Sequence, residues 1–272
     1  LGEVLWSGAL AMRRDIGRAL AREGILPILS RLVMETGEGP IAVRGALDGE
    51  GAFQLAHAAS PSGEVERIVL NLWVELAGKR GRTHGPPPPG AGERISVGRV
   101  FAEHVFTRPF APADARRVVR LPPPEPAAGD GADATTFSLW GPDGVPPARH
   151  AFAPAESLLE LPDGADALDA ALEVDPAPVV FGLGHTDSNQ HVNSLVYPRL
   201  FEAAALRRVA AHGLDVARLP RSIEVGYRKP AFAGERAVVA ARAFRLGDGF
   251  GVVGAFAPNL AARPSVTCRV LF

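Results

Sequence analysis

The chain has 272 residues, of which 47% are hydrophobic, and a formal net charge of −1. This length and composition predict a globular protein of one or two domains, and the near-neutral charge gives no basic surface for nucleic acid. No apolar run approaches the roughly 20 residues that a membrane-spanning helix needs. The single cysteine, Cys268, excludes an internal disulfide framework and a cysteine-based metal cluster. With no signal-peptide pattern at the start, we expect a cytoplasmic protein that binds neither nucleic acid nor membrane.

The first half is predicted to be one helix followed by antiparallel strands. Residues 4–24 carry apolar residues at helical spacing. Strands are expected at four stretches rich in β-prone residues: 28–35, 40–47, 51–59 and 64–78. Asp48-Gly49, a common hairpin-turn sequence, would connect the second and third of these strands. Residues 94–120 are mixed in character, and within them Arg108-Pro109-Phe110-Ala111-Pro112 favours irregular chain.

Two proline-rich stretches interrupt the chain. Residues 80–92 contain four consecutive prolines, which cannot join a helix or a central strand and therefore predict a loop or stiff spacer. The second stretch, 121–134, combines proline with glycine and alanine, and a plain linker is favoured there over a ligand for a partner domain. We therefore expect an N-terminal domain at 1–120 and a C-terminal domain at 135–272.

The second half repeats the order of helix and then strands. Short strands are expected at 135–140, 157–161 and 179–183, with a small helix at 163–172. A longer helix is predicted at 197–212, with Pro198 in its first turn and Gly213 at its end. The strands expected after it are 223–228, 236–246, 250–256 and 265–272. Cys268, in the last strand, is predicted to be a small core residue. Both halves thus share an architecture, without a visible repeat in sequence.

A polar segment precedes the longer helix and reads H-T-D-S-N-Q-H-V-N-S from His185 to Ser194. Because side chains alternate along a strand, an extended conformation would place on one face His185, Asp187, Asn189 and His191. Neither face of such a strand would be apolar. The pattern therefore predicts a strand that runs into a loop and brings a carboxylate, an amide and an imidazole together.

The same segment has two other interpretations. Asn193 or Ser194 could cap the following helix while the residues before it are solvated. Alternatively, His185, Asp187 and His191 could bind zinc or iron, although all three ligands would then come from one short strand. Polar residues before a helix are common, so composition alone does not choose between capping and chemistry.

The run T-D-S-N-Q-H-V-N-S-L-V-Y-P-R-L-F-E, residues 186–202, resembles the hot-dog-fold acyl thioesterases. It is similar both to the 4-hydroxybenzoyl-CoA thioesterase-like group and to the acyl-ACP thioesterases, whose shared pattern is D-x-N-x-H-V-N-N with a tyrosine and an acidic residue along the central helix. The matching positions are Asp187, Asn189, His191, Val192, Asn193, Tyr197 and Glu202. Ser194 replaces the usual second asparagine. Residues 223–236 also resemble the strand and turn that follow the helix in these enzymes.

The resemblance implies an α+β fold of two tandem hot-dog domains, each a curved antiparallel sheet wrapped around a central helix. Because the first half has no D-x-N-x-H pattern, one active site per chain is expected, in the second half. The implied activity is hydrolysis of an acyl thioester of coenzyme A or acyl carrier protein, with no metal and no cofactor. A homodimer of such double hot dogs is compatible with it.

Thioester hydrolysis needs a base or nucleophile and a site for the oxyanion. Asp187 is the expected base or nucleophile, Asn189 would hold the water or the carbonyl, and His191 would assist proton transfer or orient Asn189. Unpaired N–H groups at the start of the 197–212 helix would form the oxyanion site. Substrate contacts are expected from Asn193, Ser194, Tyr197, Glu202 and Arg228.

One departure from the acyl-ACP thioesterases affects the expected chemistry. Those enzymes carry a Glu-Cys pair after Tyr-Arg-Arg, whereas here Tyr227-Arg228-Lys229 is followed by Pro230-Ala231. Neither of these two residues can do acid–base or nucleophilic work. The departure favours a rival hypothesis, a non-hydrolytic hot-dog protein that binds or transfers acyl chains in a polyketide or fatty-acid pathway. A dehydratase of the same fold would need a histidine on a different helix and a paired acid, which the sequence does not show.

Overall fold

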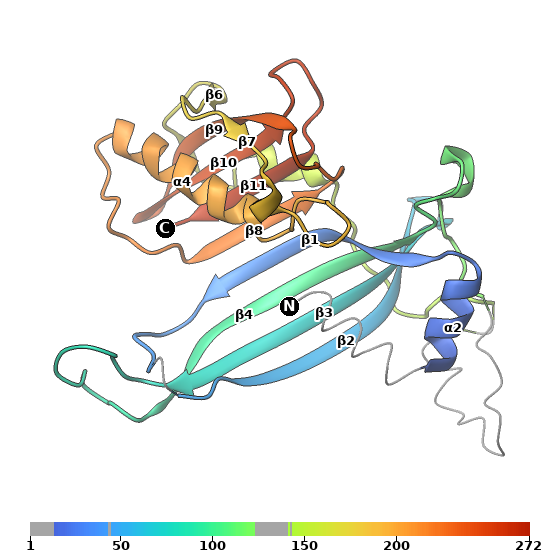
Figure 1. The fold of residues 1–272 in the computed structure, drawn as a ribbon, viewed down its shortest axis with the longest axis horizontal. Coiled ribbons are helices and arrows are strands. Elements are labelled where there is room, and N and C mark those ends of the chain that lie inside the picture. Colours follow the sequence, from blue (N-terminus) through green and yellow to red (C-terminus); the bar gives the residue numbers. More distant parts are fainter. Residues whose placement is uncertain (1–13, 43–44, 123–140, 142) are drawn as a thin grey trace.

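One antiparallel sheet extends through the molecule (Figure 1). The computed structural model describes residues 14–272 except 43–44, 123–140 and 142. The expected strand at 135–140, most of the expected linker and the start of the expected first helix therefore lie outside the described residues. Within the part of the chain that is described, no helix is long and apolar enough to cross a bilayer.

The N-terminal half contains a short helix and four long strands: α2 (Arg14–Arg22), β1 (Leu26–Thr36), β2 (Asp48–Ala59), β3 (Val65–Lys79) and β4 (Arg94–Thr107). Short elements follow: η1 (Ala113–Ala115), η2 (Ala155–Leu159), β5 (Asp166–Ala167), β6 (Glu173–Val174), β7 (Val179–Val180) and η3 (Leu183–His185). The C-terminal half has a long helix and four strands: α4 (Val196–Ala211), β8 (Ser222–Tyr227), β9 (Arg236–Leu246), β10 (Gly249–Ala257) and β11 (Val266–Leu271).

The centre of the sheet is the antiparallel pairing of β1 with β8, in which Leu32 lies opposite Val225. The strand order is β2-β3-β4-β1-β8-β11-β10-β9-β5. Moving outward from the central pair, each half adds its fourth, third and second long strand in the same order. The described residues therefore form one continuous antiparallel sheet with one main helix, α4.

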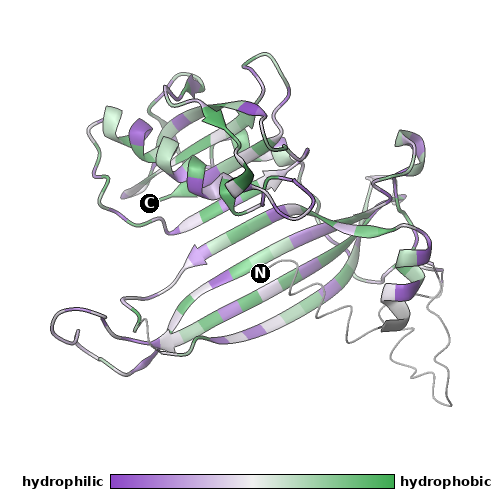
Figure 2. Cartoon of the chain, viewed as in Figure 1, coloured by the Kyte–Doolittle hydropathy of each residue, from purple (hydrophilic) through white to green (hydrophobic). Residues whose placement is uncertain are grey.

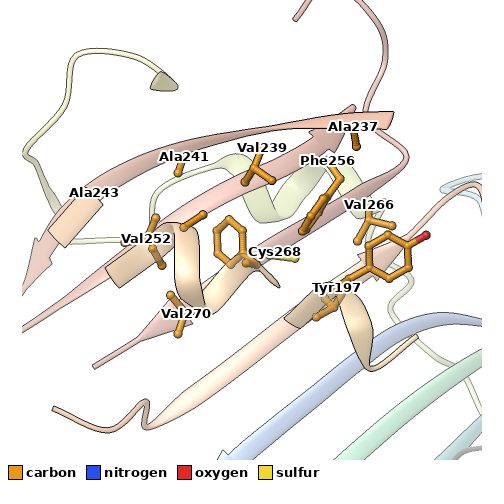
Figure 3. Close-up of a cluster of buried hydrophobic side chains, with 14 of the residues drawn as sticks. Tyr197, Ala237, Val239, Ala241, Ala243, Val252, Phe256, Val266, Cys268 and Val270 are labelled. Carbon is orange, nitrogen blue, oxygen red and sulfur yellow. The ribbon is translucent and has the colours of Figure 1, made fainter. Parts of the chain in front are cut away.

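Helix α4 packs against one face of the C-terminal strands and forms the larger hydrophobic cluster (Figure 3). The helix contributes Tyr197, Phe201, Ala204, Ala205 and Val209, and the strands contribute small residues such as Ala241 and Ala243. Gly254 permits the closest approach, because a Cβ there would lie 2.6 Å from the Phe201 ring. Small strand residues thus let the helix lie close to the sheet, and burial of these apolar side chains stabilises the packing.

The N-terminal strands alternate between two faces, as Figure 2 shows by the alternating hydropathy along each strand. On β3, Leu70 and Leu72 belong to the second hydrophobic cluster, whereas Asn71 between them points to the other face. The proline run is in the loop that closes the β3–β4 hairpin, where the Arg80 N–H donates to the Glu93 carbonyl at 2.8 Å. It is therefore a hairpin loop and not a spacer between domains.

Several expected elements are wrong. Residues 40–47 form no strand in their described part, where only Ile41 bridges to Arg80. Asp48-Gly49 is not a turn but the start of β2, because pairing with the long strand β3 outweighs the local turn preference. Residues 157–161 begin in the 3-10 helix η2, and 163–172 contains the two-residue strand β5 in place of a helix.

The largest omission is β4 at Arg94–Thr107, a stretch for which the sequence predicts no strand, whereas residues 108–112 are irregular as expected. Two ionisable side chains of this strand, Glu103 and His104, are buried, so the strand lacks the usual alternation of buried apolar and exposed polar residues. His104 is 3% exposed, and burial lowers its pKa to about 4, so its ring is neutral at pH 7. Glu103, 1% exposed, faces the opposite side, where it has hydrogen-bonding partners. Hydrogen-bonding partners distant in sequence therefore allow a charged residue to occupy a buried position in this strand.

These partners include a connecting segment, residues 145–160, which we call the strap. His150 Nε2 lies 2.5 Å from Glu103 Oε2, and the Ser30 hydroxyl donates to Glu103 Oε1 at 2.5 Å. Asn71 Nδ2 lies 3.2 Å from His150 Nδ1, which completes a four-residue polar cluster between the strap and the sheet. The strap thus starts with Val145 against the second hydrophobic cluster, pairs with β2 beside His57, and from His150 onward covers the opposite face of the N-terminal strands.

The strap continues onto the C-terminal strands. Thr267 points away from the α4 cluster, to which its neighbours Val266 and Cys268 belong, and its hydroxyl donates to the Ala155 carbonyl. Gly226 on β8 lies beneath the same residue, where an added Cβ would come within 2.9 Å of Ala155. The strap therefore spans both halves on the face opposite α4.

The polar cluster under the strap predicts a measurable coupling energy. Glu103→Ala should lower the free energy of unfolding by about 2–4 kcal/mol, because it removes the carboxylate partner of His150 from a buried place and leaves the Ser30 hydroxyl only the backbone carbonyl of residue 103. His150→Ala should cost less on its own. In a double-mutant cycle measured by urea denaturation, the two losses should overlap by about 1 kcal/mol or more. Losses that simply add would show that Glu103 and His150 do not interact.

A second ionic cluster ties the end of α4 to the sheet. Asp169 accepts hydrogen bonds from Arg208 Nε at 2.8 Å and from the Ala243 N–H at 2.7 Å, and lies 2.7 Å from His212 Nε2. Burial by itself raises the pKa of Asp169, but the Arg208 hydrogen bond, the Ala243 N–H and His212 outweigh it and lower the pKa to about 2.

The lowered pKa of Asp169 predicts that the folded protein loses stability in acid. The folded pKa of Asp169 lies below the ordinary value of 3.8, so its contribution is present above pH 4 and is lost as the pH falls toward 2. The contribution is about 2 kcal/mol. Unfolding measured between pH 5 and pH 2 should therefore show that wild type loses about 2 kcal/mol more than Asp169→Asn does. Equal losses in the two proteins would contradict this role.

Candidate functional site

The polar segment before α4 is a tight turn and not an extended strand. Asp187 N–H donates to the His191 carbonyl at 2.8 Å, and Gln190, with φ of 61°, donates from its N–H to the Asp187 carbonyl. Thr186 and Val192 bridge at the base of the turn. The expected alternation of four polar side chains on one face is therefore wrong, because local hydrogen bonds close the chain on itself.

The Asp187 carboxylate holds this turn together. Its Oδ1 atom accepts the Asn189 N–H at 2.8 Å and the His191 N–H at 3.0 Å. Its Oδ2 atom receives no hydrogen bond from the described residues, and the side chain is half-buried. The turn thus fixes the orientation of the carboxylate and leaves one oxygen open.

The amide and imidazole take different positions around this carboxylate. Asn189 is exposed at the tip of the turn. His191 is half-buried, and its ring meets the Phe232 ring edge-on at a centroid distance of 5.1 Å. The structure therefore brings the backbones of Asp187, Asn189 and His191 into one turn, while Phe232, which sequence analysis did not single out, packs against the imidazole.

The segment leads directly into the start of α4. Asn193 Oδ1 accepts the Leu195 N–H at 2.9 Å, and the Asn193 carbonyl accepts the Val196 N–H at 3.0 Å. The Asn193 N–H in turn donates to the His185 carbonyl at 2.8 Å. The Asn193 side chain thus closes a turn just before the helix, whose N-cap residue Leu195 has no side-chain cap hydrogen bond, and the motif turn and the helix start form one hydrogen-bonded unit.

The remaining candidate residues lie in different surroundings. Tyr197 is buried among the rings of Phe181, Tyr227 and Phe256 at centroid distances of 5.4–6.0 Å, and burial raises its pKa to about 12. Glu202 is half-buried on α4 and makes no hydrogen bond or ion pair with the described residues.

Arg228 and Tyr227, which follow the helix, make contacts that the sequence does not predict. Arg228 donates to the carbonyls of Pro264 and Arg263, so its guanidinium secures the chain before β11. The Tyr227 hydroxyl donates to the Ser194 carbonyl at 2.9 Å, a contact that sequence analysis missed. The only signal in the sequence is the position of Tyr227 at the end of a predicted strand, where a tyrosine usually packs.

The position of Pro230-Ala231 is next to the motif. The Ala231 carbonyl accepts the Val192 N–H at 2.8 Å, and Phe232 bridges to His191.

Cys268 is fully buried, and burial raises the pKa of its thiol well above the usual value. Among the described residues, no group of three or more His, Cys, Asp or Glu side chains is arranged to hold a metal ion. The metal-site interpretation therefore has no support from the geometry.

Comparisons with known proteins place the fold. No protein-family model matches the chain, and no curated protein matches it. Among solved structures, a putative oleoyl thioesterase from Lactobacillus plantarum aligns with a TM-score of 0.51 and 11% identity, over 98% of this chain and 86% of that one.

Two further solved structures are similar. An acyl-ACP thioesterase from Bacteroides thetaiotaomicron aligns at 14% identity and TM-score 0.49, over 100% of this chain and 87% of that one. The 12:0-ACP thioesterase from Umbellularia californica aligns at 13% identity and TM-score 0.49, over 93% and 74%. At these identities the similarity concerns the fold alone. The large antiparallel sheet with one main helix is consistent with the hot-dog fold.

Proposed function

We propose that this protein is a thioesterase that hydrolyses an acyl thioester of acyl carrier protein or coenzyme A. The observation that carries the proposal is the Asp187 carboxylate, held by two backbone N–H groups in a turn that is hydrogen-bonded to the start of α4. A fixed carboxylate with one free oxygen beside a helix N-terminus supplies both a base and a partial positive charge.

The proposed reaction assigns a part to each group. Oδ2 of Asp187 takes a proton from a water, whose oxygen forms a bond with the thioester carbonyl carbon. The carbonyl oxygen becomes an oxyanion and is stabilised by the positive end of the α4 dipole and by the Tyr197 N–H, because in this first turn the Val196 N–H already donates to Asn193 and Pro198 has no N–H. The C–S bond then breaks, and the thiolate leaves with the proton from Asp187. Alternatively, Asp187 attacks the carbonyl itself and water hydrolyses the resulting acyl intermediate.

The neighbouring residues have supporting parts in this proposal. Asn189 holds the water or the carbonyl, and His191 assists proton transfer from its place against Phe232. Substrate contacts are assigned to the residues expected from the sequence: Asn193, Ser194, Tyr197, Glu202 and Arg228. Two of these have the least support: Tyr197 is buried among aromatic rings, and Arg228 already donates to two backbone carbonyls.

The proposal includes two tandem hot-dog domains, at 1–120 and 135–272. The support is topological, because the helix and four strands occur in the same order in each half and the strand order is mirrored about the β1–β8 pair. In this arrangement the second half carries the chemistry and the first half helps to enclose the acyl group. The homodimer and the cytoplasmic location stay predictions.

A second candidate function is supported by one observation. Pro230-Ala231 lies beside the turn that carries the motif, where Ala231 accepts the Val192 N–H, and offers no titratable side chain there. A non-hydrolytic protein that binds or transfers acyl chains would need only the acyl site and no base. Such a protein would bind acyl thioesters without releasing free thiol.

Release of free thiol from acyl-CoA and from acyl carrier protein thioesters tests the proposal. Asp187→Asn is the sharpest variant, because asparagine keeps an oxygen for the Asn189 and His191 N–H groups and removes the base. We expect kcat to fall by about 100-fold or more in this variant, the usual contribution of a general base.

Asp215→Asn is the matched control, because Asp215 Oδ1 accepts the Ala217 N–H in a similar turn after α4. It should keep wild-type turnover. Full activity in Asp187→Asn would remove Asp187 from the mechanism. Binding of acyl thioesters by wild type without any thiol release would favour the second candidate function.

A further inference from the structure

The carbonyl of Ser194 lies at a place where the helix cannot supply its hydrogen bond. Helix α4 begins at Val196, with Leu195 in helical conformation before it. The donor four residues after Ser194 would be residue 198, which is proline and has no N–H. The backbone carbonyl just before α4 therefore needs a donor from elsewhere in the chain.

The Tyr227 hydroxyl is that donor. It lies 2.9 Å from the Ser194 oxygen, although the two residues are 33 positions apart in sequence. Burial raises the pKa of Tyr227 well above its usual value, so the phenol keeps its proton at neutral pH. A neutral buried hydroxyl with a single carbonyl acceptor gives a hydrogen bond of fixed direction.

Tyr227 is also well placed to hold the helix start rigidly. It is the last residue of β8, the central strand that pairs with β1. Its ring packs against both hydrophobic clusters, the one around α4 and the one in the N-terminal half. The ring also meets Tyr197, the second residue of α4, at a centroid distance of 6.0 Å. One side chain thus connects the helix start to the junction between the halves.

We propose that Tyr227 is a positioning residue for the active site, which fixes the first turn of α4 through the Ser194 carbonyl. This inference rests on the proposed function, because it gives the start of α4, with its Tyr197 N–H, a fixed place against the thioester oxyanion. A misplacement of such donors by a fraction of an ångström weakens transition-state binding more than substrate binding. Tyr227 itself touches no reacting atom in this proposal.

The variant Tyr227→Phe removes the hydroxyl and keeps the ring. In thiol-release kinetics it should lower kcat by about 10-fold, as expected for one lost orienting hydrogen bond, and leave KM within about twofold. Thr267→Val is the matched control, because it removes a buried hydroxyl that donates to the Ala155 carbonyl on the opposite face of the neighbouring strand β11. The control should keep the wild-type kcat.

Rescue through the backbone makes the test specific. Pro198→Ala restores an N–H at the position from which a helix would serve the Ser194 carbonyl. The double variant Tyr227→Phe/Pro198→Ala should therefore regain most of the kcat lost in Tyr227→Phe, when compared with Pro198→Ala as its reference. A simple loss of packing would not be repaired in this way.

Amide hydrogen exchange of residues 193–199 gives a readout that does not need activity. Exchange should be faster in Tyr227→Phe than in wild type and should slow again in the double variant. If wild type releases no thiol, the proposed function fails, and exchange alone then decides whether Tyr227 holds the helix start. The inference would be overturned if Tyr227→Phe kept the wild-type kcat and the wild-type exchange rates. It would also be overturned if the double variant lost as much kcat as Tyr227→Phe does.

Discussion

The pairing of β1 with β8 is the constraint on which both halves of the molecule depend. It joins two sets of strands into one sheet through residues 31–35 and 222–226. Leu32 and Val225 lie opposite each other on the buried side, while Arg31 and Glu224 form an ion pair on the other face. A shift of one residue would exchange these faces and bury the charges against the core, so the register is strongly specified.

Backbone hydrogen bonding also explains why so many polar residues precede α4. Asp187 and Asn193 each satisfy N–H groups that the turn and the helix start leave unpaired. The two oxygens of Asp187 can have different roles, because Oδ1 accepts the N–H groups of the turn and Oδ2 receives no hydrogen bond from the described residues. A structural role in closing the turn and a catalytic role are therefore compatible, although the sequence alone presents them as alternatives.

The long elements could be predicted from the sequence because local patterns and tertiary packing agree there. The helix at 197–212 is found at Val196–Ala211, and the four strands that follow it differ from expectation by one residue or so at their ends. Strand β4 could not be predicted, because Glu103 and His104 are buried beside residues distant in sequence. The turn at Asp187 was missed for the opposite reason, since local hydrogen bonds outweighed the strand alternation. The bond from Tyr227 to Ser194 depends on strand pairing that no local pattern reveals.

The place of Cys268 has a practical consequence for work with this protein. It is the single cysteine of the chain, and in the fold it is fully buried in the α4 cluster with a raised thiol pKa. A thiolate-selective reagent therefore meets no reactive sulfur while the chain is folded, since the thiolate is the reactive form. On denaturation the same reagent would find one sulfhydryl per polypeptide, so labelling of Cys268 is an intrinsic chemical probe of global opening.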